Sequence, residues 1–206
     1  PPLPDKTPAD AGKRLRRAVR KLKEGGPFRI VLLGDSISND LANTPFEMLL
    51  QRHFPKAEIG IRWMGSGGTG WRVFKQQIQQ RVIRHDPDLV ILLALSNKST
   101  TMRQDLTQTI ARIRAGCSEA DLLLVTNPDI IYKPARLGIR TQRPIYLQVA
   151  EEQSVELVDL FPRWTAYVEG TAKPLNWFLR DAVHNNVRGR QVLARVVVRH
   201  LAKAGK

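Results

Sequence analysis

The chain has 206 residues, of which 42% are hydrophobic and 25% are charged. These proportions are typical of a globular protein with room for one domain and a sizeable core. No apolar run approaches the roughly 18 residues that would indicate a membrane span. Lysine and arginine outnumber aspartate and glutamate by 33 to 19, a net charge of +14. The excess is spread over several predicted helices without a recognisable nucleic-acid-binding module. We therefore expect solvated helix faces and no specific nucleic-acid or membrane partner, with an anionic substrate as the second interpretation.

The start of the chain and its cysteine count concern the domain bounds and the location of the protein. Residues 1–9 are rich in proline and lack a signal-like apolar core, which predicts a linker or N-terminal extension before a single domain over 10–206. The one cysteine, Cys117, excludes an intramolecular disulfide and leaves export neither supported nor excluded. We favour a secreted or periplasmic location over a cytoplasmic one, and the oligomeric state stays open.

Predicted strands and helices alternate along the chain. An amphipathic helix carries Leu15, Ala18, Val19 and Leu22 and ends at Gly25–Gly26. The elements that follow are strand 28–34, helix 44–54, strand 57–64, helix 71–84, strand 88–95, helix 101–115, strand 121–127, helix 142–153, strand 155–160 and a last helix from about 187 to 203. Short apolar runs between helices of ten or more residues predict an α/β domain with a mostly parallel sheet covered on both faces.

Residues suited to catalysis follow the predicted strands. Ligands of such sheets bind beyond the carboxyl ends of the strands. Ser36 follows the first strand, the glycine-rich segment 65–70 follows the second, and Asn97 follows the third. Asp181 and His184 stand just before the last helix. We expect these four stretches to meet at one rim of the sheet.

The residue types fit nucleophilic catalysis. A serine hydroxyl becomes a useful nucleophile when a histidine takes its proton, and the histidine needs an acceptor to orient it. Asp181 and His184 are three positions apart, which places both side chains on one side of a helical turn. A tetrahedral intermediate also needs hydrogen-bond donors for its oxyanion. The backbone N–H of Ser36, a glycine N–H of 65–70 and the amide of Asn97 are the candidates.

Four short blocks of this sequence resemble the SGNH (GDSL-type) hydrolases. They are GDSIS at 34–38, the glycine-rich turn at 65–70, Asn97, and DAVH at 181–184. The resemblance implies a flavodoxin-like three-layer fold with strand order 2-1-3-4-5 and no metal or organic cofactor. It implies Ser36 as nucleophile, Asp181 and His184 as the rest of the triad, and Gly68 and Asn97 in the oxyanion hole. It also implies an ester hydrolase, for which we favour short acyl groups, acetyl above all, on a carbohydrate or another small ester.

Two departures from the family pattern concern the oxyanion hole. The third block commonly reads Gly-x-Asn-Asp, but here Asn97 is preceded by Leu95-Ser96 and followed by Lys98. The second block has four glycines in six residues, so Gly67 competes with Gly68 as the donor. Gly68 fits the usual spacing from Gly65.

Two alternatives come from other functional classes. The segment GSGGTG (65–70) matches the dinucleotide fingerprint G-x-G-x-x-G after a strand, which favours a nucleotide-binding protein. Its acidic partner is missing from the far end of the next strand, where Ser96 and Asn97 stand. A catalytically inactive binding module on the same scaffold is the third interpretation. Trp71 and Trp177 flank the candidate blocks, and we expect packing roles for them, with sugar stacking as the alternative.

Overall fold

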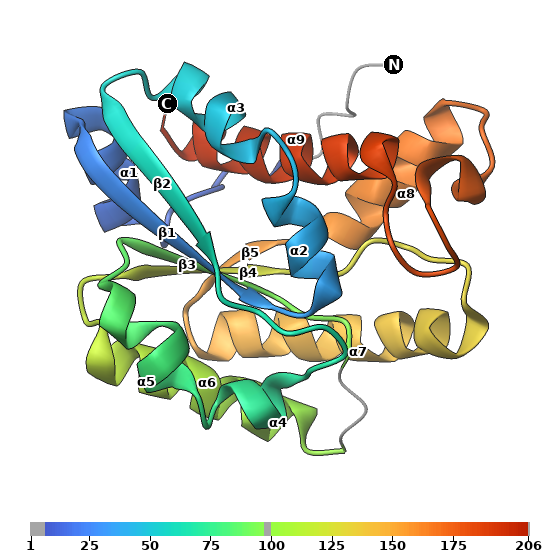
Figure 1. Cartoon of the computed structure of the whole chain (residues 1–206), viewed down its shortest axis with the longest axis horizontal. Coiled ribbons are helices and arrows are strands. Elements are labelled where there is room, and N and C mark those ends of the chain that lie inside the picture. The colour runs from blue at the N-terminus through green and yellow to red at the C-terminus, as the bar shows by residue number, and fades with distance from the viewer. Residues whose placement is uncertain (1–6, 97–99, 206) are drawn as a thin grey trace.

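A parallel sheet forms the centre of the computed structural model, which describes residues 7–96 and 100–205, and their side chains apart from those of 134–137. The sheet has five strands in the order β2-β1-β3-β4-β5, and every pairing is parallel (Figure 1). The strands are β1 (Gly26–Gly34), β2 (Ala57–Trp63), β3 (Leu89–Leu93), β4 (Asp121–Val125) and β5 (Glu156–Val158). The predicted α/β fold and its strand order are confirmed.

Helices cover both faces of the sheet (Figure 1). One layer consists of α1 (Arg16–Glu24), α2 (Ser36–Ala42), α3 (Phe46–His53), α8 (Leu160–Gly170) and α9 (Val187–Ala204). The other consists of α4 (Trp71–Phe74), α5 (Ile78–Arg81), α6 (Met102–Gly116) and α7 (Lys133–Glu152). Two 3₁₀ turns, η1 (Ile83–His85) and η2 (Leu175–Phe178), complete the described elements.

The continuous apolar runs of the sequence reflect burial on both sides of the sheet. Successive side chains of a strand point to opposite faces. In β3, Leu89, Ile91 and Leu93 join the core beneath α9, whereas Val90 and Leu92 join the core beneath α6. All five residues of β3 are buried, so neither face of this central strand reaches solvent.

Several helices differ from the sequence expectation. The predicted helix 71–84 is divided into α4, α5 and η1. The predicted helix 142–153 begins earlier, at Lys133, and continues through Pro144. Helices α2 and α8 were not predicted. Helix α2 has only seven residues, and Pro162 in α8 suggested a loop. Pro162 lies in the first turn of α8, where the missing N–H of proline is tolerated.

Thr7, the first described residue, contacts the body of the fold. Thr7 is buried, and its hydroxyl accepts a hydrogen bond of 2.8 Å from Arg163. Lys203 of α9 donates to the Thr7 carbonyl at 3.0 Å. The division into an extension over 1–9 and a domain over 10–206 stays a prediction.

Within the described ranges, no helix combines the length and the apolar character needed to cross a membrane.

The ends of β1 and β3 lie side by side. Gly34 pairs with Leu93 in the parallel register. A Cβ on Gly34 would lie 1.7 Å from the Leu93 carbonyl oxygen, so only glycine permits this close approach. The segments that follow the two strands therefore leave the sheet next to each other.

Candidate active site

Ser36 stands at the first position of α2, immediately after β1. The backbone of Asp35 is extended, and its carboxylate caps the helix by accepting from the Ile37 N–H at 3.0 Å. Asp35 also accepts from the N–H groups of Leu95 at 2.8 Å and Ser96 at 2.6 Å. Burial raises the pKa of Asp35, against the effect of these hydrogen bonds. The aspartate of the Gly-Asp-Ser block therefore joins the start of α2 to the end of β3.

Asp181 and His184 lie in a turn that precedes α9. Asp181 accepts hydrogen bonds from the N–H groups of Val183 at 2.8 Å and His184 at 2.7 Å. The turn is closed by the Arg180 N–H, which donates to the His184 carbonyl at 2.9 Å. Asn186 then caps α9 by accepting from Arg188 and Gly189.

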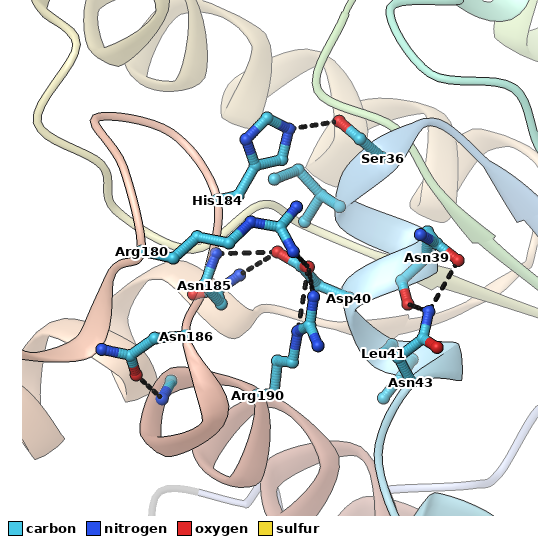
Figure 2. A network of polar contacts seen from close by, with 12 residues as sticks. Ser36, Asn39, Asp40, Leu41, Asn43, Arg180, His184, Asn185, Asn186 and Arg190 are labelled. Atoms are coloured by element: carbon cyan, nitrogen blue, oxygen red, sulfur yellow. Dashed lines mark hydrogen bonds and ion pairs between the residues drawn. The ribbon is translucent and has the colours of Figure 1, made fainter.

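The three side chains form one hydrogen-bonded chain. Nε2 of His184 lies 2.9 Å from the Ser36 hydroxyl (Figure 2). Nδ1 of the same ring lies 2.9 Å and 3.1 Å from the two carboxylate oxygens of Asp181. These distances suit proton transfer between a hydroxyl and a base. The structure thus brings together three of the five predicted site residues, from sequence positions far apart.

The carboxyl of Asp181 is ionised at neutral pH. Partial desolvation works against its charge, but the hydrogen bonds from the backbone N–H groups of His184 and Val183 and from the His184 ring outweigh it, and they lower the pKa of Asp181 to about 2. An ionised carboxylate accepts only, so Nδ1 of His184 carries the proton in this pair and Nε2 is left to accept from Ser36. The side chains of Asp181 and His184 are 50% and 27% exposed, so the site is open to solvent.

Of the candidate oxyanion donors after β2 and β3, the structure describes the glycines of the loop 65–70. Gly68 lies in the loop between β2 and α4 with φ of +67°, and a Cβ there would meet nothing within 4 Å. That loop is joined to β1 by a hydrogen bond from the Ser66 N–H to the Gly34 carbonyl at 3.1 Å. Gly67 is also exposed in this loop. Asn97 lies outside the described residues.

Sequence reasoning missed the buried residues that join the segments carrying Ser36 and His184. Asp40 is fully buried and lies one helical turn after Ser36 on α2. It accepts from the backbone N–H of Asn185 at 2.7 Å and from Arg190 at 2.9 Å and 3.0 Å (Figure 2). The only local signal was its i+4 spacing from Ser36, because the partners come from the other end of the chain.

The tryptophans differ in their surroundings. Trp71 is completely buried and donates its indole N–H to the Tyr146 hydroxyl at 3.0 Å, so its expected packing role is confirmed. Trp177 is 45% exposed. The guanidinium of Arg188 lies 4.4 Å from its ring centroid and the Lys173 ammonium 5.4 Å, both within the range of cation–π attraction.

The described side chains contain no group of three or more histidines, cysteines, aspartates or glutamates that could hold a metal ion. The GSGGTG segment follows β2, an edge strand of the sheet, and the helix after it, α4, has only four residues. A dinucleotide fingerprint places the pyrophosphate at the N-terminus of a full crossover helix, and this segment lacks one.

A parallel sheet with a serine, a histidine and an aspartate at its carboxyl rim is an arrangement used by hydrolases that act through a serine nucleophile. Comparison with protein families gives a match to the GDSL-like lipase/acylhydrolase family over residues 32–192. The chain belongs to this family, and its class is therefore that of an ester or acyl hydrolase.

Solved structures share the fold. An acetylxylan esterase from Geobacillus stearothermophilus is 19% identical with a TM-score of 0.73, over 87% of this chain and 96% of that one. A lipase/acylhydrolase from Enterococcus faecalis is 22% identical with a TM-score of 0.68, over 85% of this chain and 95% of that one. No curated protein is similar enough in sequence to count as a match.

Proposed function

We propose that this chain hydrolyses carboxylic esters through an acyl-enzyme on Ser36. The observation that carries the proposal is the hydrogen-bonded chain from Ser36 through His184 to Asp181, with 2.9 Å at each link. Variants of the G. stearothermophilus esterase described as catalytic mutants replace a serine, a histidine and an aspartate. The same three residue types form the hydrogen-bonded series Ser36–His184–Asp181.

In the first half of the reaction, Ser36 Oγ attacks the ester carbonyl carbon while its proton passes to Nε2 of His184. The charge of Asp181 stabilises the imidazolium that forms and holds the ring orientation. The tetrahedral intermediate then collapses: the bond to the alcohol oxygen breaks, and that oxygen takes the proton from Nε2. The products of this half are the free alcohol and an ester of Ser36.

In the second half, water replaces the alcohol. His184 takes a proton from the attacking water, a second tetrahedral intermediate forms, and Ser36 leaves with the proton returned by His184. The carboxylic acid is released and the free serine is restored. In both intermediates we assign the oxyanion to the N–H groups of Ser36 and Gly68 and to the amide of Asn97.

For the substrate we propose a short acyl group, acetyl in the first place, on a carbohydrate. The acetylxylan esterase of the same fold supports this choice. The exposure of Asp181 and His184 also supports it. An open site can bind one sugar unit of an oligosaccharide, and a short acyl group needs no deep tunnel. Arg180 is 44% exposed, and its Nε lies 3.7 Å from Asp181 Oδ2, which together with the charge of +14 favours a substrate with anionic groups.

The test is turnover of p-nitrophenyl acetate by the wild type, Ser36→Ala and His184→Ala. We expect kcat/KM to fall at least about a thousandfold in both variants, since each removes a member of a unit that acts together. Ser118→Ala and His53→Ala are matched controls, because both residues are exposed and belong to other elements, and both should retain wild-type rates. Equal, low rates in all folded proteins would contradict the proposal and favour an inactive binding module or a nucleotide-binding protein.

A further inference from the structure

A second aspartate on α2, Asp40, connects the nucleophile's helix to the histidine's turn. Its side chain is completely inaccessible to solvent, and a buried carboxylate is stable only when it is paired and hydrogen-bonded. Asn185 supplies its backbone N–H at 2.7 Å and its side-chain amide at 3.2 Å. Arg190 supplies Nε and a terminal nitrogen at 3.0 Å and 2.9 Å.

These contacts lie next to both ends of the Ser36–His184 hydrogen bond. Asp40 follows Ser36 by four positions, so both side chains lie on the same side of α2. Asn185 is the residue after His184, and Arg190 lies in the first turns of α9. Figure 2 shows the Asp40 carboxylate beside Asn185, Arg190 and Arg180, with His184 and Ser36 farther up in the same view. One carboxylate thus fixes the turn and α9 against the helix that carries the nucleophile.

Arg180 extends this network to the triad aspartate. Its guanidinium lies 3.6 Å from Asp40 Oδ1 and 3.7 Å from Asp181 Oδ2. Arg180 is thus within ion-pair distance of both carboxylates. The buried aspartate and the triad aspartate share this arginine.

We propose that Asp40 is a positioning residue that holds His184 within proton-transfer distance of Ser36. The inference rests on the proposed function, because it assigns Asp40 a role in the reaction of that same site. Asp40 touches neither substrate nor reacting atoms and acts through Asn185 and the turn. A displacement of about 1 Å between reacting groups costs up to about a hundredfold in rate, so the loss of this anchor reduces kcat.

The test is Asp40→Asn, which keeps the side-chain shape but turns an amide NH₂ toward donors. We expect kcat for p-nitrophenyl acetate to fall about 10- to 100-fold with KM changed less than about threefold. In a His184→Ala background the same substitution should cause no further loss, because the two residues act through one step. Arg190→Gln removes charged donors from the same carboxylate, and it should lower kcat by a smaller factor. It replaces Asp40→Asn as the test variant if Asp40→Asn folds poorly.

Glu156→Gln is the matched control. Glu156 is also a buried carboxylate, 5% exposed, and it also pairs with a residue of α9, His200, at 2.6 Å. It is the first residue of β5, at the amino-terminal ends of the strands, whereas the candidate site lies beyond their carboxyl ends. We expect it to lower stability while kcat of the folded protein stays at the wild-type value.

Hydrogen exchange separates this inference from the proposed function. Amides of the segment 179–186 should exchange faster in Asp40→Asn than in the wild type, while those of β4 stay unchanged, whether or not an ester is turned over. If the wild type is inactive but the segment loosens, the proposed function fails and the positional anchor stands. The inference is overturned if the segment's exchange is unchanged, if kcat stays within threefold of wild type, or if Glu156→Gln reduces kcat equally.

Discussion

The carboxylate of Asp35 accepts a hydrogen bond of 2.6 Å from the backbone N–H of Ser96, which lies 61 positions further along the chain. With the N–H groups of Leu95 and Ile37, it holds three backbone donors at the rim of the sheet. The aspartate next to Ser36 therefore connects the segment after β3 to the start of α2. Its removal tests how far the candidate site depends on that connection.

We expect Asp35→Ala to lower the free energy of unfolding by about 2–4 kcal/mol. Two buried N–H groups and one half-buried N–H group lose their acceptor at about 1–3 kcal/mol each. The relief of a desolvated carboxylate offsets part of this loss. Urea unfolding measures the change. The exposed Asp10, whose ion-pair partner is Lys13, gives the control Asp10→Ala, with less than about 0.5 kcal/mol expected. Equal stability of Asp35→Ala and the wild type would contradict this prediction.

Gly65 shapes the loop that carries Gly68. A Cβ on Gly65 would lie 2.0 Å from the Gly34 carbonyl oxygen and 2.4 Å from the Trp63 indole nitrogen. Gly65→Ala should therefore destabilise the protein by about 2–3 kcal/mol and lower kcat, because the loop moves away from the end of β1. Thermal unfolding and ester turnover measure the two effects.

Gly60→Ala is the control for Gly65→Ala. Gly60 is exposed in β2, and a Cβ there meets nothing within 4 Å. Alanine is favoured over glycine in a strand by roughly 0.5–1 kcal/mol, so this variant should be unchanged or slightly more stable. Full activity and stability in Gly65→Ala would show that the loop tolerates displacement.

The lowered pKa of Asp181 predicts a pH-dependent contribution to stability. Hydrogen bonds lower its pKa from 3.8 to about 2 in the folded state, so the unfolded chain binds the proton more readily. The stabilisation is therefore complete above about pH 4 and is lost as the pH falls toward 2. Because the side chain is half exposed, solvent reduces the effect, and we expect about 1 kcal/mol at neutral pH.

Chemical denaturation of the wild type and Asp181→Asn between pH 2 and 7 measures this contribution. The stability difference between the two proteins should be constant above about pH 4 and shrink below it. A difference that does not depend on pH would contradict the ionised, hydrogen-bonded state of Asp181.

Trp177 is the candidate surface for a sugar ring. Its backbone carbonyl accepts at 2.9 Å from the side chain of Asn186, which lies two residues after His184. Its side chain is partly exposed, and Arg188 and Lys173 lie within cation–π distance of the ring. We expect Trp177→Ala to raise KM for an acetylated oligosaccharide about fivefold, or about 1 kcal/mol, with KM for p-nitrophenyl acetate unchanged. An unchanged KM for both esters would remove Trp177 from the substrate site.

The strands of the sheet and the segments that carry Ser36, Asp181 and His184 were predictable, because each is marked by local sequence. Runs such as 89–95 have no polar face, which identifies a strand buried on both sides. Ser36 follows one such run, and Asp181 and His184 share a short turn. The strand order came from the resemblance to a family rather than from the runs themselves.

The contacts of Asp40 were not predictable, because they are long-range. The sequence around Asp40 indicates an ordinary polar residue. In the structure, Asp40 is buried against Asn185 and Arg190, which lie 145 and 150 positions further along the chain. Helix α8 was missed for a different reason. Its apolar residues Leu160 and Trp164 are buried in the core, but Pro162 between them indicates a loop when only the sequence is considered.

Covalent labelling of Ser36 tests the central claim most directly. The wild type is incubated with a fluorophosphonate, which phosphonylates an activated serine hydroxyl with loss of fluoride, and the modified peptide is located by mass spectrometry. We predict a single adduct on Ser36, much slower labelling in His184→Ala, and protection by a slowly hydrolysed ester. No adduct on the folded wild type, or an adduct on another serine at the same rate in both proteins, would contradict the assignment of Ser36 as the nucleophile.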